Sequence, residues 1–358
     1  MKYVGIDVHK KMCQAAVLEE DGELLDQIRF ANRKEDIKDF AFKLLTFRDD
    51  VKAVVESTGN LWIQIHDILE KYGIEVSLSN PYKTRLIAEA KIKTDKVDAK
   101  MLARLLRADM LFTCYVPGEE IRNRREFLRH RLNLVKMRTQ IKNRIHGILD
   151  KHGLRIPYPT KFSKKSITWL RTQDLGFMDE AIVDGQLALL ETLDEQIRVL
   201  EDKIAAIAVE DPQVRLLMTM PGIGFFTASL LVAEIGDINR FSNDKKISSW
   251  ATLAPRISQS GEKTHIGRVS GPGNKRVAAM MVQCAHTARR YDARFSRAYK
   301  RVSRRGGKGK AVVAVAHLMI RIVYFMLVRN EPYRGQNAKM TTRKLKTMEG
   351  RARIGLRI

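Results

Sequence analysis

The chain has 358 residues, with 65 Lys and Arg against 41 Asp and Glu, and carries a formal net charge of +24. This length exceeds one ordinary compact core, so we expect two or three domains of about 100 to 150 residues. Such an excess of positive charge points to a polyanionic partner, usually nucleic acid, and argues against an enzyme of small molecules. The longest apolar runs, at 311–316 and 322–328, are shorter than the roughly 20 residues of a membrane span, so none is expected.

The charge is unevenly distributed along the chain. Residues 1–115 carry 19 basic and 19 acidic side chains, whereas residues 216–358 carry 28 and 7. Residues 116–180 are also basic, with 15 against 7, and residues 181–215 are acidic, with 3 against 8. This pattern predicts a nucleic-acid surface on the first long helix and the C-terminal third, and another task for the neutral N-terminal segment.

The N-terminal segment alternates strand-like and helix-like patterns. Short apolar runs separated by turn residues predict strands at 3–6, 13–18, 24–30, 52–55 and 75–78. Apolar residues at helical spacing predict a helix capped by Asn32, and further helices at 61–72 and 84–106. This order predicts an α/β domain with a ribonuclease-H-like fold.

The middle of the chain is expected to be helical. Six apolar residues from Leu190 to Ile207 step alternately by three and four, which is a heptad seam. A looser stripe runs from Leu134 to Ile148. Two such helices predict either an antiparallel pair within one chain or an arm for dimerisation.

Four carboxylates stand where a metal site would need them. Asp7 and Glu56 each follow an apolar strand, and Asp95 and Asp98 share one face of a helix because they are three residues apart. Oxygen ligands without clustered His or Cys favour two Mg²⁺ or Mn²⁺ ions, of the kind that assist phosphoryl transfer. Alternatively, each acid alone caps a turn or a helix start. His9 has two interpretations, a metal or phosphate ligand and a solvated loop residue.

Two segments of the C-terminal third predict contacts with phosphate. Gly222 and Gly224, in Pro-Gly-Ile-Gly before an apolar helix, are typical of a helix-hairpin-helix, whose backbone N–H groups hold a phosphate, although a turn for helix packing has the same pattern. The loop that follows, rich in Ser, Gly and cations, offers a hydroxyl nucleophile and phosphate-neutralising side chains. Its cations are Lys263, Arg268, Lys275 and Arg276. The alternative is an ordinary surface loop.

Five motifs in order resemble the insertion-sequence transposases of the IS-one-ten family, with Piv-like DNA invertases as relatives. These motifs are Gly-Ile-Asp-Val-His-Lys, Val-Glu-Ser-Thr-Gly, Lys-Thr-Asp-Lys-Val-Asp-Ala, Pro-Gly-Ile-Gly, and Leu-Ala-Pro followed by Ser-Gly-x-Lys, within residues 1–334. The resemblance implies a RuvC-like DEDD domain at 1–115, a helical coiled coil at 116–212 and a helical transposase domain at 213–335. It places Asp7, Glu56, Asp95 and Asp98 at the DEDD positions and Ser260 at the serine position.

The resemblance also implies partners and a location. Family members are thought to combine the two domains from different subunits of a homo-oligomer, and to use a structured bridge RNA to act on donor and target DNA. We therefore expect a cytoplasmic, nucleoid-associated protein of a bacterium or archaeon, in keeping with three cysteines that lack disulfide or zinc spacing.

The sequence departs from the family pattern at two places. Glu262 replaces a glycine after the serine, and Ser270-Gly271-Pro272-Gly273 replaces a lysine-containing stretch, which keeps Ser270 as a second candidate nucleophile. The basic tail at 336–358 lies beyond the resemblance and is expected to be disordered and dispensable for chemistry. Rival functions are a Mg²⁺-dependent junction nuclease, a site-specific DNA invertase, and a nucleic-acid-binding protein without catalysis.

Overall fold

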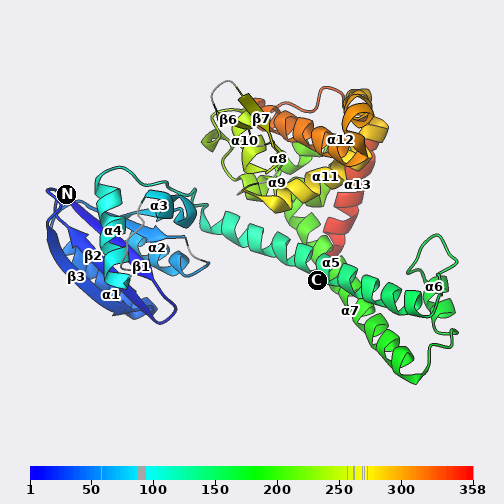
Figure 1. Ribbon diagram of the computed structural model, residues 1–358, viewed down its shortest axis with the longest axis horizontal. Coiled ribbons are helices and arrows are strands. Elements are labelled where there is room, and N and C mark those ends of the chain that lie inside the picture. Colours follow the sequence, from blue (N-terminus) through cyan, green and yellow to red (C-terminus); the bar gives the residue numbers. More distant parts are fainter. Residues whose placement is uncertain are drawn as a thin grey trace. The chain divides into compact units, whose positions relative to one another are not determined.

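The computed structural model of the chain describes residues 1–57, 59–87, 94–255, 257–260, 263–267, 269, 271 and 273–357, with the backbone alone at 85–87, 257–260 and 263–266. The chain divides into two compact units, Met1–Pro117 and Gly118–Ile358 (Figure 1). The first boundary lies two residues beyond the one expected from the sequence. The coiled-coil and transposase regions, expected as separate domains, form one unit.

The first unit contains a mixed five-stranded sheet with the order β3-β2-β1-β4-β5. Its strands are β1 (Lys2–Val8), β2 (Met12–Leu18), β3 (Leu24–Ala31), β4 (Val51–Glu56) and β5 (Glu75–Ser79). The first three strands form an antiparallel meander, and β4 and β5 continue the sheet in parallel with β1. This topology is consistent with the predicted RuvC-like domain.

Helices cover both faces of this sheet. Val4 and Ile6 of β1 lie in a buried apolar cluster with α1 (Lys34–Leu45) and α2 (Trp62–Lys71). Because successive side chains of a strand point to opposite faces, Gly5 belongs to the other face, where α4 (Asp95–Arg107) packs on β1 and β2. Strands β1, β2 and β4 are buried along most of their length, as expected for a sheet covered on both faces, whereas β3 at the edge is largely exposed.

Two details of this unit differ from the sequence predictions. The helix expected at 84–106 is two elements, α3 (Pro81–Ile87) and α4, because Thr94 is extended and its hydroxyl accepts the Val97 N–H as an N-cap. Asn32 does not cap α1. The N-cap is Arg33, and the Asn32 amide instead donates to the carbonyl of His9.

The second unit begins with a long helical hairpin. Helix α5 (Glu119–Lys151) packs against α7 (Phe177–Ala208), with α6 (Lys164–Leu170) between them in sequence. Leu190 and Leu193 of the heptad seam contact the apolar stripe of α5, and α13 packs along the same α7. Most of the seam is thus covered within the chain, as expected for a helix pair, whereas its last residue, Ile207, is 46% exposed.

The remaining elements enclose a large apolar core. They are α8 (Pro212–Leu217), α9 (Phe225–Ile235), the 3-10 turn η1 (Ile238–Arg240), α10 (Asp244–Trp250), β6 (Ile257–Ser260), β7 (Lys263–Ile266), α11 (Lys275–Tyr291), α12 (Ala293–Arg329) and α13 (Ala338–Gly355). Helix α9 is predominantly apolar, and its buried apolar residues are divided between this core and a smaller cluster with Leu128 and Ile204.

The prediction that the C-terminal tail is disordered is wrong. Residues 338–355 form helix α13, whose Met348 is fully buried and whose Arg351 pairs with Glu201 and Asp202 of α7. A Cβ at Gly355 would lie 2.2 Å from the Asp202 carbonyl oxygen, so the two backbones are in close contact. The charge count hid an apolar stripe, and this stripe packs the helix into the core.

Helix α12 bears on the prediction that the chain has no apolar segment long enough to span a membrane. In the described part of the chain it alone is long and apolar enough to cross a bilayer, because His317 and Arg321 are the only interruptions between the two short apolar runs. Its buried side chains belong to the core, and Arg321 pairs with Asp244 at 2.6 Å. Length and composition are weak evidence for a span where a core helix has the same pattern.

Replacing Met348 with Ala should lower the free energy of unfolding of the second unit by about 2 to 5 kcal/mol, because it leaves a cavity under α13. Lys346→Ala, at an exposed position of the same helix, should change it by less than about 0.5 kcal/mol. Denaturant unfolding measures both. Equal, small effects would mean that α13 does not contribute to the core.

Candidate active site

The ends of two parallel strands bring the first two carboxylates to one edge of the sheet. Ile6 of β1 pairs with Val55 of β4, so the next residues, Asp7 and Glu56, come at the same edge. Asp7 follows the alternation of Gly5 and therefore lies on the face that α4 covers. Both acids line one hollow of about 390 Å³.

Helix α4 supplies the other two carboxylates from its first turn. A Cβ on Gly5 would lie 2.1 Å from the Ala99 carbonyl oxygen, so only glycine allows the helix this close to β1. Because Thr94 fixes the start of the helix, Asp95 and Asp98 reach the hollow that Asp7 and Glu56 line. The structure therefore brings all four predicted acids together.

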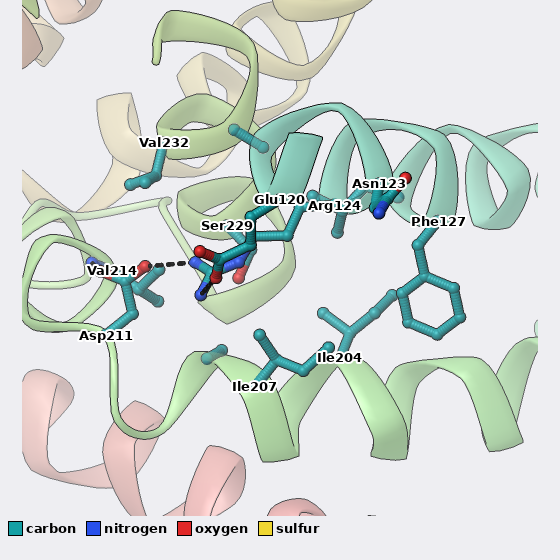
Figure 2. A pocket seen from close by; sticks show the side chains of 13 residues that line it. Glu120, Asn123, Arg124, Phe127, Ile204, Ile207, Asp211, Val214, Ser229 and Val232 are labelled. Atoms are coloured by element: carbon teal, nitrogen blue, oxygen red, sulfur yellow. Dashed lines mark hydrogen bonds and ion pairs between the residues drawn. The ribbon is translucent and has the colours of Figure 1, made fainter. Parts of the chain in front are cut away.

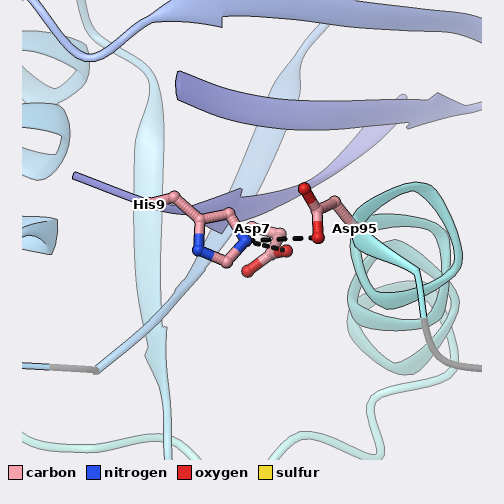
Figure 3. Close-up of side chains that lie close together, drawn as sticks. All are labelled: Asp7, His9 and Asp95. Atoms are coloured by element: carbon pink, nitrogen blue, oxygen red, sulfur yellow. Dashed lines mark ion pairs between the residues drawn. The ribbon is translucent and has the colours of Figure 1, made fainter. Parts of the chain in front are cut away.

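His9 joins this cluster from the turn after β1. Its Nε2 lies 3.2 Å from Asp7 Oδ2 and 3.3 Å from Asp95 Oδ1 (Figure 3). The backbone carbonyl of His9 is held by Asn32, which restrains the turn. The sequence left His9 undecided. Its spacing of two residues from Asp7 was the available signal.

The electrostatics of the cluster favour a cation. Burial raises the pKa of Asp7, and the neighbouring charges of Asp95, Asp98 and Glu56 raise it further, against the opposing effect of His9. One ligand atom each of Asp7, His9 and Asp95 lies within 4.8 Å of the others. Hard carboxylate oxygens that repel one another suit a divalent ion, so these residues fit the expected metal.

The predicted nucleophile lies in the hairpin of the second unit. Ser260 ends β6 and is the cross-strand partner of Lys263 on β7. Arg268 and Ser270 lie outside the described residues. The serine segment, residues 251–273, connects α10 to α11. The Asn274 N–H directly after it donates to the Trp250 carbonyl at 2.7 Å, so the two ends of the segment lie close together.

A buried ion pair fixes the end of the serine segment. Glu234 of α9 is 2% exposed and receives two hydrogen bonds from Arg129 of α5, at 2.7 and 2.8 Å. The same carboxylate accepts a hydrogen bond from the Asn274 amide at 2.8 Å, and Asn274 is the N-cap of α11. Burial alone would raise the pKa of Glu234, but the Arg129 hydrogen bonds and charge outweigh it and lower the pKa.

The glycine turn between α8 and α9 has both a packing and a terminal role. Gly222 has φ +87°, and a Cβ there would lie 2.5 Å from the Cys284 carbonyl oxygen of α11. Gly224 is the N-cap of α9 and has no side-chain cap. The first residue is thus required for close packing, which was the alternative interpretation, and the second leaves the helix start without a side chain over it.

Part of the charge on the first long helix is neutralised inside the unit. Arginines of α5 pair with acids of the acidic segment, as in Arg131 with Glu201 and Arg138 with Asp194. Arg124 likewise pairs with Asp211. The prediction of a nucleic-acid surface on this helix is therefore weakened, because these side chains are already satisfied.

Exposed cations gather elsewhere in the unit. Lys275 and Arg276 are exposed in the first turn of α11, where positive charge opposes the helix dipole and therefore suits an anionic partner. The first half of α12 contains a larger group of cations. The charge count of the sequence included them only in the total for residues 216–358. The members of this group, all exposed, are Arg294, Arg297, Lys300, Arg301, Arg304, Arg305, Lys308 and Lys310. No acid interrupts residues 293–310, which was the available signal.

A larger, apolar cavity of about 450 Å³ lies between α5, α7, α8 and α9. Phe127, Ile204 and Ile207 line it, and the Arg124–Asp211 pair closes one side (Figure 2). Its lining offers no cluster of nucleophiles or metal ligands. The four carboxylates line a different hollow, in the first unit.

Comparison with known proteins matches two segments of the chain, one with the carboxylates and one with Ser260. A family model of the DEDD type, described as "Transposase", matches residues 4–153, and a second, described as "Transposase IS116/IS110/IS902 family", matches residues 214–300. The first contains all four carboxylates and the second contains Ser260. The two matches together define a transposase.

Full-length relatives give the same assignment. The transposase of insertion sequence element IS1111A from Coxiella burnetii is 26% identical over 93% of this chain and 92% of its own. Putative transposase y4rJ from Sinorhizobium fredii is 30% identical over 74% of each chain. The pilin gene-inverting protein of Moraxella bovis is 25% identical over 92% of this chain and 97% of its own.

The chain belongs to the IS110 family of insertion-sequence transposases, enzymes that cut and rejoin DNA. DNA is therefore its substrate, and the DEDD type of its first segment indicates use of a divalent metal.

Replacing Asp7 with Asn should lower divalent-ion affinity and slow DNA strand cleavage by at least about 10³-fold, because the cluster loses its most buried charge. DNA affinity should remain within about twofold, since the exposed cations are unchanged. Asp39→Asn, an exposed acid on α1, should leave all three quantities unchanged. Ion titration, cleavage assays and DNA binding measure them.

The same variant carries a pH signature in the metal-free protein. The folded-state pKa of Asp7 is raised, so ionisation of this group costs stability as pH rises through that value. Asp7→Asn should therefore become more stable than the wild type as pH increases from about 4 to 7. A difference that is constant over this range would contradict the raised pKa of Asp7.

Proposed function

We propose that this transposase cuts and rejoins DNA through Ser260 with the help of the Asp7, Glu56, Asp95 and Asp98 cluster, and that a structured noncoding RNA guides it. The observation that carries the proposal is the convergence of four carboxylates on one hollow in a DEDD-type segment. The ions expected there are Mg²⁺ or Mn²⁺, which when bound supply positive charge to the oxygens of a scissile phosphate.

The chemistry assigned to the serine conserves phosphodiester energy. The Ser260 Oγ attacks phosphorus, an Oγ–P bond forms, the bond to the 3′ oxygen breaks, and that oxygen takes up a proton. Attack by a 3′ hydroxyl on the phosphoserine then reverses these changes and frees the serine. Each step exchanges one phosphoester for another, so no external energy is needed. Ser270 is the reserve nucleophile.

Nucleic acid would contact the exposed cations of the second unit. Lys263, Arg268, Lys275 and Arg276 are proposed to neutralise phosphates near the serine, and the first half of α12 extends this basic surface. Gly224 starts α9 without a side-chain cap, which suits a phosphate held by backbone N–H groups, with Gly222 shaping the turn. A homo-oligomer is proposed for the active complex, as the family resemblance implies.

A second candidate function is site-specific DNA inversion. It is favoured by the pilin gene-inverting protein of Moraxella bovis, which matches nearly the whole chain. Inversion uses the same strand exchange and differs in how the DNA ends are paired. A reporter in which the segment between two ends can either leave or invert separates the two outcomes.

The serine assignment is tested by trapping protein on DNA. Wild-type protein with Mg²⁺ and DNA carrying the element's end should give a denaturation-resistant adduct, which Ser260→Ala should lose. Ser258→Ala, on the same strand, should retain it. Cleavage without any adduct would favour a nuclease in which water attacks, and loss only in Ser270→Ala would move the nucleophile to that residue.

The basic surface is tested by salt dependence. Replacing Arg301, Arg304 and Arg305 with Gln should reduce the slope of log affinity against log salt by about 0.9 for each phosphate that the variant no longer neutralises. A control with the same change of charge on the first unit uses exposed Lys34, Arg48 and Lys71. An equal effect in the control would show that net charge, and not this surface, binds DNA.

A further inference from the structure

One side chain from the C-terminal helix holds the turn between α8 and α9. The Lys344 Nζ of α13 donates hydrogen bonds to the carbonyl oxygens of Met218, Met220 and Ile223. The bonds to Met220 and Ile223 are each 2.9 Å long. An ammonium group has three N–H donors, so this turn uses all of them.

The surroundings of Lys344 isolate this group from other charges. In the described part of the chain its hydrogen-bond partners are these carbonyls, and no carboxylate forms an ion pair with it. Burial lowers the pKa of Lys344 to about 8, with the Cys284 thiol of α11 as the neighbouring titratable group. A neutral amine has only two N–H groups, so the three carbonyls favour the ammonium form at neutral pH.

The three carbonyls would repel one another without a cation between them. Met218 is the C-cap of α8, where the helix dipole is negative, and Met220 and Ile223 flank Pro221 and Gly222. On its other side the turn is pressed against α11, since Gly222 leaves no room for a Cβ. The turn is therefore held between the backbone of α11 on one side and the buried ammonium group of Lys344 on the other.

We infer that the Lys344 ammonium acts as a tethered monovalent cation in a cage of backbone carbonyls, through which α13 sets the conformation of the glycine turn. Lys344 is thus a positioning residue. Its effect on DNA rests on the proposed role of the start of α9 in phosphate binding, whereas its effect on the turn does not.

This role predicts that a free cation can replace the side chain. Lys344→Ala empties a cage sized for an ammonium group, which K⁺ or NH₄⁺ can enter. Lys344→Met keeps the aliphatic stem and fills the space without a charge. Lys346→Ala removes the same charge from an exposed position of the same helix.

The experiment compares thermal unfolding and affinity for duplex DNA of the element's end in KCl, NH₄Cl and tetramethylammonium chloride at equal ionic strength. In tetramethylammonium chloride, Lys344→Ala should unfold several degrees below the wild type and bind DNA about tenfold more weakly. KCl or NH₄Cl should restore most of both losses. Lys344→Met should remain impaired in every salt, and the wild type and Lys346→Ala should not distinguish the cations.

Two results would overturn the inference, and a third would overturn only its effect on DNA. The first is a loss in Lys344→Ala that no cation restores, since that describes ordinary packing. The second is equal recovery in Lys344→Met. The third is recovery of unfolding temperature with no change in DNA affinity for any Lys344 variant, which would remove the role in DNA positioning while leaving the cage.

A measurement on the wild type keeps the inference testable if the variants do not fold. An ammonium group bonded to three carbonyls exchanges its protons slowly, so ¹⁵N-labelled lysine should give one protected NH₃⁺ signal by nuclear magnetic resonance. Lys344→Arg should remove this signal. Its absence from the wild type would overturn the cage, whatever the DNA-binding results are.

Discussion

The arrangement of the second unit depends on the hydrogen bonds that the buried carboxylate of Glu234 accepts. This carboxylate receives a two-pronged hydrogen bond from Arg129 of α5 and a third hydrogen bond from Asn274, which starts α11. Arg125 of α5 also donates hydrogen bonds to the backbone carbonyls of Ala233 and Glu234, at the end of α9. Removing Arg129 would cost stability, because it takes the balancing charge from a carboxylate that is 2% exposed. One side chain thereby ties the long hairpin to the base of the serine segment.

In the first unit the comparable constraint is the absence of a side chain. Gly5 lets α4 pack directly on β1, and the Thr94 cap sets where that helix begins. Asp95 and Asp98 then face the strand ends that present Asp7 and Glu56. Four like charges in one hollow destabilise the metal-free protein, which is the usual cost of a site prepared for a cation. His9 offsets part of this cost through its contacts with Asp7 and Asp95.

The use of charge differs between the long helices. On α5 several arginines are paired with acids of α7 or with Asp211, the N-cap of α8, so the basic and acidic segments seen in the sequence partly neutralise each other within one unit. On the first half of α12 the cations are exposed and no acid lies between them. Lys344 represents a third use, in which a buried charge organises backbone carbonyls. Net charge alone does not separate these three cases, because it does not record where each side chain ends.

The sequence by itself indicated the strands of the first unit, the four carboxylates and the family, because apolar periodicity and short motifs are local properties of the chain. It did not determine the place of His9, whose approach to two acids depends on how a turn meets a helix 86 residues later. Nor did it decide the tail: seven cations in 336–358 suggested disorder, whereas α13, with Met348 buried, packs against α7 and α9 in the core. Tertiary structure decided such features because burial and pairing depend on residues far apart in the chain, which no local pattern records.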